Sequence, residues 1–157
     1  NSICKIINTL ASNAEILIFD EPVLGLDANH RELFYKELME NYIENPKTII
    51  LSTHIIEEVS NLIEKVIILN NNKIISSDEA EELLDKAYTV SGLSENIDKF
   101  ISEKNIVNIE EITSFKSATI IGNLTKEDKK LAQDLDLKFS KVELQKLFIY
   151  LTEKEEV

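Results

Sequence analysis

Two carboxylates and one imidazole follow two neighbouring apolar segments of the sequence. The run Ile-Leu-Ile-Phe at 16–19 ends directly at Asp20 and Glu21. The run Thr-Ile-Ile-Leu at 48–51 ends at a Ser-Thr pair followed by His54. One carboxylate at such a position can hold Mg²⁺ through its water shell, its neighbour can orient or deprotonate an attacking water, and the imidazole can donate a hydrogen bond to a terminal phosphate. These residue types predict Mg²⁺-assisted chemistry on a phosphate-bearing substrate.

Each of these features also has an ordinary structural explanation. An Asp-Glu pair after a strand is usually only the charged start of a loop, and His54 alone is more often an exposed residue at the start of a helix. In the segment Leu-Gly-Leu-Asp at 24–27, Gly25 fits a left-handed turn and Asp27 fits the N-cap of a helix. His30 falls one turn into that helix, and we expect no partner for it. The order and spacing of all these features together favour the functional interpretation.

Buried parallel strands are the elements that would bring these side chains to one edge. Both apolar runs are continuous rather than alternating, which is typical of strands buried on both faces of a parallel sheet. Open α/β sheets bind their ligands at the carboxyl ends of such strands. The expected elements up to residue 87 are a helix over 3–11, a strand over 16–19, a helix over 28–43 with Phe34, Leu38 and Tyr42 inward, a strand over 48–51, a helix over 55–63, a hairpin of 65–69 and 73–75 through an Asn-rich turn, and a helix from Ser76 to near Lys86. Ser76 and Glu79 fit a capping box. The first 87 residues therefore predict an α/β fold with a largely parallel sheet and a hairpin at its end.

The pattern changes after Ala87, where short β-prone stretches alternate with short helices. The expected elements are strands over 88–90, 107–115, 118–121 and 137–139, and helices over 94–103, 126–132 and from Ser140 onward. Ser140 and Glu143 fit a second capping box, and the last helix places Leu144, Leu147, Phe148 and Leu151 on one face. We therefore expect two domains, an α/β part over 1–87 and a small α+β part over 88–157.

Composition excludes several classes of protein. The chain has 157 residues, 43% of them hydrophobic, and a net charge of −12. Its longest apolar run has five residues, Leu147 to Leu151, which is too short to cross a bilayer, and no secretory signal pattern is present. The single Cys4 is expected to be a reduced thiol, and the acidic charge argues against nucleic-acid binding. The sequence has only three glycines and so contains no Gly-rich phosphate loop.

In this order and spacing, the motifs resemble those of the nucleotide-binding domains of ABC transporters. Residues 16–20 resemble the Walker B strand, Glu21 stands at the position of the catalytic glutamate, 24–27 resembles the D-loop, and His54 resembles the switch histidine. The hairpin over 66–75 resembles the one that closes the catalytic core. The resemblance implies a partial P-loop NTPase fold of the ABC type over 1–87. It also implies ATP and Mg²⁺ as cofactors, with Asp20 on the metal, Glu21 as general base, Asp27 at a dimer interface and His54 on the γ-phosphate.

The later residues resemble the small C-terminal domain of bacterial drug, bacteriocin and lantibiotic exporter ATPases, whose terminal apolar helix is similar to 142–152. A generic amphipathic helix would explain the same pattern. The resemblance implies an ATPase dimer partner, transmembrane permease subunits, no nucleic acid, and a cytoplasmic protein held peripherally at the inner face of the cell membrane. The accessory part over 88–157 is expected to be regulatory.

The departures from the family pattern limit what the chain can do alone. The P-loop, the adenine-stacking aromatic residue and the Q-loop glutamine are absent, and an LSGGQ-type signature would end just before Asn1. Ile3 stands where the family usually has a basic residue. We therefore expect a C-terminal portion of a longer exporter ATPase, inactive in isolation. Two alternatives remain, namely a non-catalytic module that binds a transporter subunit, and a soluble ABC protein of DNA repair or translation.

Overall fold

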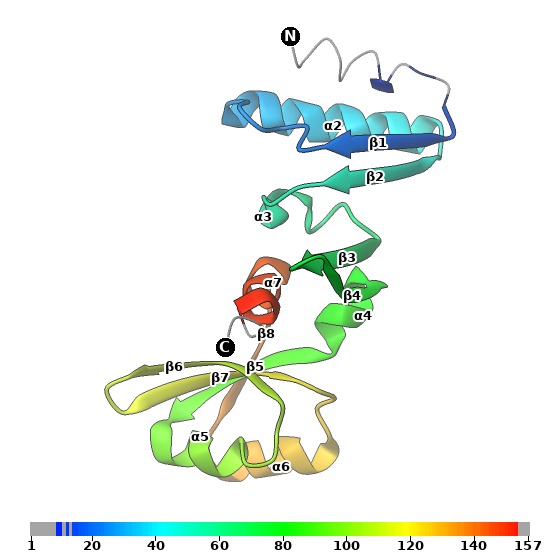
Figure 1. Cartoon of the computed structure of the whole chain (residues 1–157). Coiled ribbons are helices and arrows are strands. Elements are labelled where there is room, and N and C mark those ends of the chain that lie inside the picture. Colours follow the sequence, from blue (N-terminus) through cyan, green and yellow to red (C-terminus); the bar gives the residue numbers. More distant parts are fainter. Residues whose placement is uncertain (1–8, 11, 13, 154–157) are drawn as a thin grey trace. The chain divides into compact units, whose positions relative to one another are not determined.

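A computed structural model describes residues 9, 10, 12 and 14–153. The helix predicted over 3–11 lies almost entirely outside the described residues. The chain divides into two compact units, Asn1–Ile56 and Glu57–Val157, which are treated separately below (Figure 1). The assignment of 1–87 and 88–157 to a catalytic and an accessory domain remains a prediction.

The first unit is a parallel strand pair covered by one long helix. Strands β1 (Ile16–Asp20) and β2 (Thr48–Ser52) pair in parallel, and α2 (Ala28–Glu44) connects them (Figure 1). Leu17 and Phe19 of β1 are buried, and the Phe19 ring meets Phe34 of α2 edge to face at 5.6 Å. This packing fixes β1 against α2. The predicted strands over 16–19 and 48–51 and the predicted helix over 28–43 are confirmed.

The prediction that both strands are buried on two faces is wrong for the described residues. Ile16, Ile18 and Ile50 have exposed fractions of 58%, 69% and 52%. Successive strand residues point to opposite faces of the sheet, and α2 covers the face that carries Leu17 and Phe19. The isoleucines lie on the other face, which no described helix of this unit covers.

The second unit begins with a helical turn and a hairpin. After α3 (Ile56–Val59), strands β3 (Lys65–Asn70) and β4 (Lys73–Glu79) pair antiparallel through Asn71 and Asn72. Both asparagines have positive φ, 47° and 60°, a conformation that Asn tolerates in tight hairpin turns. The predicted hairpin is therefore confirmed. It forms its own two-stranded sheet.

The capping box predicted at Ser76 is wrong because β4 continues through that residue. The Ser76 hydroxyl donates to Asp78 within the strand, and α4 (Ala80–Asp85) begins only after Glu79. Glu79 is the N-cap but makes no side-chain capping bond. Pairing with β3 therefore outweighs the helix-start pattern.

A four-stranded antiparallel sheet with two helices forms most of the second unit. Strands stand in the order β6-β7-β5-β8, and the chain order strand-helix-strand-strand-helix-strand gives the ferredoxin-like arrangement. Tyr88, Val90, Ala118 and Ile120 pack with Ile97, Phe100 and Ala132 in one core. This topology specifies the α+β part predicted from the sequence. The elements are β5 (Ala87–Leu93), α5 (Ser94–Phe100), β6 (Ile106–Ile112), β7 (Phe115–Ile121), α6 (Lys126–Asp134) and β8 (Lys138–Lys141).

The last helix, α7 (Leu144–Glu153), returns to the hairpin. Leu144 and Leu147 are buried as predicted, and the Asn70 side-chain amide donates to the Thr152 carbonyl at 2.9 Å. The capping box predicted at Ser140 is wrong, because Ser140 lies in β8 opposite Thr89 and the helix begins four residues later. None of the described helices is long and apolar enough to cross a bilayer.

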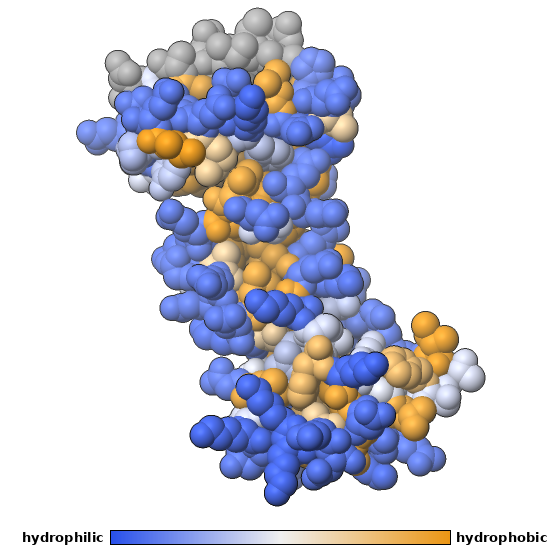
Figure 2. Space-filling view, turned by 180° about the vertical axis from the view of Figure 1, so that it is seen from behind, coloured by the Kyte–Doolittle hydropathy of each residue, from blue (hydrophilic) through white to orange (hydrophobic). Residues whose placement is uncertain are grey.

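Some apolar side chains remain on the surface of the second unit. Leu93, Ile112 and Phe115 are exposed and adjacent, since Phe115 is the register partner of both others. Figure 2 shows hydrophobic patches that interrupt the mostly hydrophilic surface.

Candidate functional site

The carboxyl ends of β1 and β2 bring Asp20 beside Ser52. The two residues are register partners, because the parallel pairing runs from Ile16 opposite Thr48 to this last pair. The Ser52 hydroxyl donates to Asp20 Oδ1 at 2.5 Å. The Glu21 amide donates to the Ser52 carbonyl at 3.0 Å, with the Ser52 hydroxyl at 3.4 Å. Ser52 therefore contacts both acidic residues.

Glu21 and His54 form the closest pair of candidate residues. His54 Nδ1 lies 2.9 Å from Glu21 Oε1, and the exposed fractions of the two side chains are 65% and 32%. The other carboxylate oxygen, Oε2, is buried and has no hydrogen-bond partner among the described residues. The pair thus has one oxygen held by the imidazole and one buried oxygen that makes no hydrogen bond within the described residues.

The loop between β1 and α2 turns sharply at Glu21. Its φ is 44°, in the left-handed region, and the Leu24 amide donates to the Glu21 carbonyl at 3.1 Å. Val23 is buried, and Gly25 has a φ of 78°, which agrees with the predicted left-handed turn. The loop is therefore anchored at Val23 while Glu21 faces β2.

Asp27 caps α2, as predicted. Its carboxylate accepts from the His30 amide at 3.0 Å and from His30 Nδ1 at 2.8 Å, so the expectation that His30 lacks a partner is wrong. The missed signal was the three-residue spacing from the N-cap, which places the two side chains on one side of the first turn. The His30 amide, followed by the His30 ring, lowers the pKa of Asp27.

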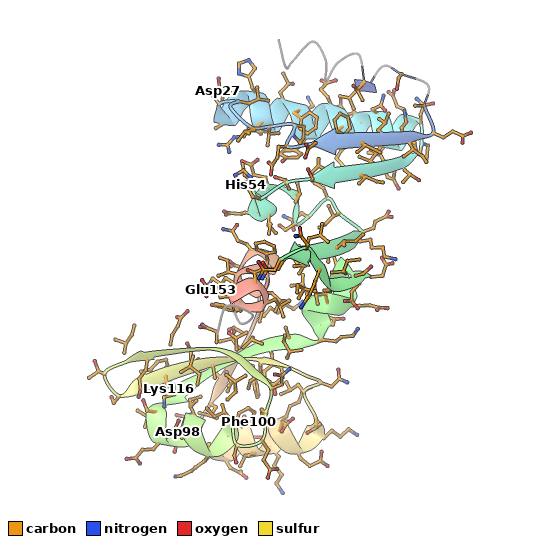
Figure 3. All side chains as sticks on the ribbon, viewed as in Figure 1. Asp27, His54, Asp98, Phe100, Lys116 and Glu153 are labelled. Atoms are coloured by element: carbon orange, nitrogen blue, oxygen red, sulfur yellow. The ribbon has the colours of Figure 1, made fainter. Side chains whose placement is uncertain are left out.

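The predicted residues are only partly brought together. Asp20, Glu21 and His54 meet at the ends of β1 and β2, whereas the hydrogen bonds of Asp27 go to its own helix. Figure 3 shows Asp27 at the start of α2 and His54 just after β2. Sequence reasoning gave no role to Ser52, although alignment of two parallel strands that both end in polar residues would have placed it beside Asp20.

The acidic residues fit a magnesium ion that a phosphate ligand would bring. Mg²⁺ commonly binds one or two carboxylates, keeps several waters and takes its other ligands from phosphates. Asp20 is exposed at the strand end and offers a carboxylate already oriented by Ser52. Within the described residues there is no group of three or more His, Cys, Asp or Glu arranged around a metal position. The carboxylates at this edge can therefore supply one or two ligands to a Mg²⁺ ion that is also bound by phosphate.

Over about half of its length, the chain is homologous to the ATP-binding proteins of ABC transporters. It is 32% identical over 76 residues to the Nod factor export ATP-binding protein I of Ralstonia nicotianae, 48% of this chain and 23% of that protein. It is 35% identical over 78 residues to the ABC transporter ATP-binding protein NatA of Bacillus subtilis, 50% of this chain and 31% of that protein. It is 41% identical over 68 residues to the energy-coupling factor transporter ATP-binding protein EcfA2 of Mycoplasmoides gallisepticum, 43% of this chain and 21% of that protein.

These matches support ATP binding, ATPase activity and transport at the level of the family. The chain covers less than a third of the length of each of these relatives. No family model matches the chain.

Proposed function

We propose that this chain supplies the water-activating half of the ATP site in the ATPase subunit of an ABC transporter. The observation that carries the proposal is the contact of Glu21 with His54, beside Asp20 at the ends of two parallel strands. In the proposed roles, Asp20 holds the Mg²⁺ of MgATP through water, Glu21 is the general base, and His54 contacts the γ-phosphate. ATP and Mg²⁺ supply the phosphoryl group and its charge neutralisation.

The geometry of Glu21 supports its role as base. His54 contacts Oε1, whereas Oε2 is buried and has no partner in the described structure. In the proposed role, Oε2 accepts the proton from a water that is admitted next to it when the ATP site is complete. Because Nδ1 of His54 contacts the carboxylate, Nε2 is the ring nitrogen left to contact the γ-phosphate.

The wider assembly is also part of the proposal. Asp27 would lie at the interface of an ATPase dimer, and the dimer would drive transmembrane permease subunits from the cytoplasmic face of the membrane. The Ralstonia relative is named for Nod factor export, which supports the proposal that the transporter is an exporter. The printed sequence has three glycines and no Gly-rich phosphate loop, so the phosphate cradle would come from residues outside these 157.

A chimera tests the catalytic roles. The matching segment of NatA is replaced by the corresponding segment of this chain, and ATP hydrolysis is measured with and without Mg²⁺. Glu21→Gln is expected to lower kcat by about 10²- to 10⁴-fold, because the general base is lost. Glu37→Gln, at an exposed position of α2, is the matched control and should keep the rate. Turnover by Glu21→Gln at the control rate would refute the assignment of the base.

A second candidate is a non-catalytic module that binds a transporter subunit through residues 88–157. The observation that favours it is the absence of a Gly-rich loop from the printed sequence. Titration of the 157-residue chain with MgATP tests this second candidate for the chain as it stands. We expect no saturable binding below millimolar concentrations, because backbone amides that cradle phosphates are missing. Micromolar binding would contradict this expectation.

A further inference from the structure

We propose that Ser52 is a positioning residue that orients the Asp20 carboxylate for the metal ion. This inference rests on the proposed function and adds a residue to its site. Ser52 ends β2 directly opposite Asp20 at the end of β1. Neither residue needs a long side chain to meet the other, because parallel register places them side by side.

The hydrogen bonds of Ser52 are specific in direction. A serine hydroxyl has one proton, and here Ser52 gives it to Asp20 Oδ1 at 2.5 Å. Hydroxyl-to-carboxylate bonds of this length are charge-assisted and about twice as strong as neutral ones. The bond fixes the rotation of the Asp20 carboxylate, and it engages Oδ1 rather than Oδ2. Oδ2 is then the oxygen presented to the water shell of Mg²⁺.

Ser52 also links the metal carboxylate to the proposed base. The Glu21 amide donates to the Ser52 carbonyl at 3.0 Å and also lies 3.4 Å from the Ser52 hydroxyl oxygen. The carbonyl bond belongs to the backbone and survives substitution of Ser52, whereas the bond to Asp20 requires the hydroxyl. Substitution therefore separates the positioning of Asp20 from the strand pairing that holds Glu21.

Paramagnetic broadening by Mn²⁺ tests the inference in the 157-residue chain, with ATP present at millimolar concentration as the phosphate ligand that brings the ion. Mn²⁺ replaces Mg²⁺ at substoichiometric concentration, and broadening of the Asp20 and Glu21 resonances reports binding there. Ser52→Ala is expected to weaken Mn²⁺ binding at Asp20 about threefold to tenfold, because a bond to a charged group is lost. Ser52→Thr keeps the hydroxyl and should bind like the wild type. Ser60→Ala is the matched control, because within the described residues the Ser60 hydroxyl donates to the Glu57 carbonyl and not to a site residue.

The Asp20→Asn variant distinguishes failure of the metal role of Asp20 from failure of the positioning role of Ser52. If broadening falls in Asp20→Asn but stays at wild-type strength in Ser52→Ala, the role of Ser52 is refuted while the metal role of Asp20 stands. If the wild type shows no broadening at Asp20, or Asp20→Asn leaves it unchanged, the metal assignment and the role of Ser52 both fail. Should Ser52→Ala unfold, Ser52→Cys keeps the side-chain size with a weak donor and is expected to weaken binding as well.

Discussion

Glu21 combines a left-handed backbone with a side chain held by a histidine. For a residue with a Cβ this conformation costs about 1–2 kcal/mol. Two backbone hydrogen bonds, from its amide to Ser52 and from the Leu24 amide to its carbonyl, hold it in place. The direction of its carboxylate therefore depends on its neighbours as much as on Glu21 itself.

At the start of α2, His30→Ala is expected to raise the pKa of Asp27 toward its usual range. The rise should be incomplete, because the His30 amide, the largest cause of the lowered pKa, remains in the variant. A carbon-detected NMR titration of the Asp27 carboxyl group, compared with the wild type, measures the change. An identical titration in both proteins would show that the imidazole does not act on this carboxylate.

Tyr88 is expected to ionise at a higher pH than a tyrosine in an unfolded chain. Burial, followed by the charge of Asp128, raises its pKa to about 12, against about 10 in an unfolded chain. Because the folded pKa is the higher one, this contribution to stability is complete below pH 10 and is lost as the pH rises toward 12. Absorbance at 295 nm during alkaline titration measures the transition, and Tyr88→Phe should remove it. A Tyr88→Phe titration identical to the wild type would contradict the assignment.

Among the elements, α6 has the most complete capping. The Thr125 side chain accepts from the Asp128 amide and the Asp128 side chain accepts from the Thr125 amide, which forms a capping box. Lys104 also donates to Asp128 Oδ1 at 2.6 Å, and this bond is the main cause of the lowered pKa of Asp128. One carboxylate thus ties the start of α6 to the segment that precedes β6.

Asp128→Asn is expected to lower the free energy of unfolding by about 1–2 kcal/mol, because it weakens a cap and an ion pair. The pKa of Asp128 is lowered by folding, so its contribution is present above about pH 4 and is lost as the pH falls further. Urea unfolding at pH 7 and at pH 3 measures both effects. The gap between variant and wild type should shrink at pH 3, and Glu127→Gln, an exposed neighbour, should change stability by only a few tenths of a kcal/mol. An equal gap at both pH values would contradict the ionic part of this explanation.

Some features of the fold could not be predicted because the same local sequence pattern is compatible with two different local structures. The apolar runs at 16–19 and 48–51 correctly predicted strands, but continuous apolarity did not reveal which face of this unit α2 covers. Ser-x-x-Glu occurs at helix starts, yet Ser76 and Ser140 belong to strands whose pairing depends on distant residues. The capping box at Thr125 was missed because Asp replaces the usual Glu.

The part of the candidate site that lies at the carboxyl ends of β1 and β2 could be predicted from the sequence. Asp20, Glu21 and His54 meet because parallel strands place their carboxyl ends at one edge. The bonds of Ser52 and His30 depend on exact register and on side-chain rotamers, which the sequence pattern does not specify. The roles of the site residues remain proposals.

At the scale of the whole molecule, the chain divides into two compact units, each with packed side chains of its own. The first unit packs β1 against α2, and the second has the core between its four-stranded sheet and α5 and α6. The boundary falls in α3, which has only four residues and is too short to be stable by itself. The join between the units is therefore the expected weak point of the backbone.

Limited digestion with a glutamate-specific protease is expected to cleave first after Glu57, Glu58 or Glu64. The product that contains β5 to β8 should persist, because the backbone of its exposed Glu110 and Glu111 is held in β6. A time course followed by mass spectrometry identifies the order of cleavage. Cuts after Glu110 or Glu111 that appear as early as those near residue 57 would contradict two independently stable units.

The strand order of the second unit bears on how such a chain could be assembled by gene rearrangement. β5 and β8 are neighbours in the sheet, with Tyr88 opposite Lys141, so the segment 88–141 starts and ends at one place. The flanking helices α4 and α7 pack on each other. A segment whose two ends are adjacent can be inserted or deleted without pulling its host apart. The ferredoxin-like part thus has the form of a cassette that a gene could gain or lose in one recombination event.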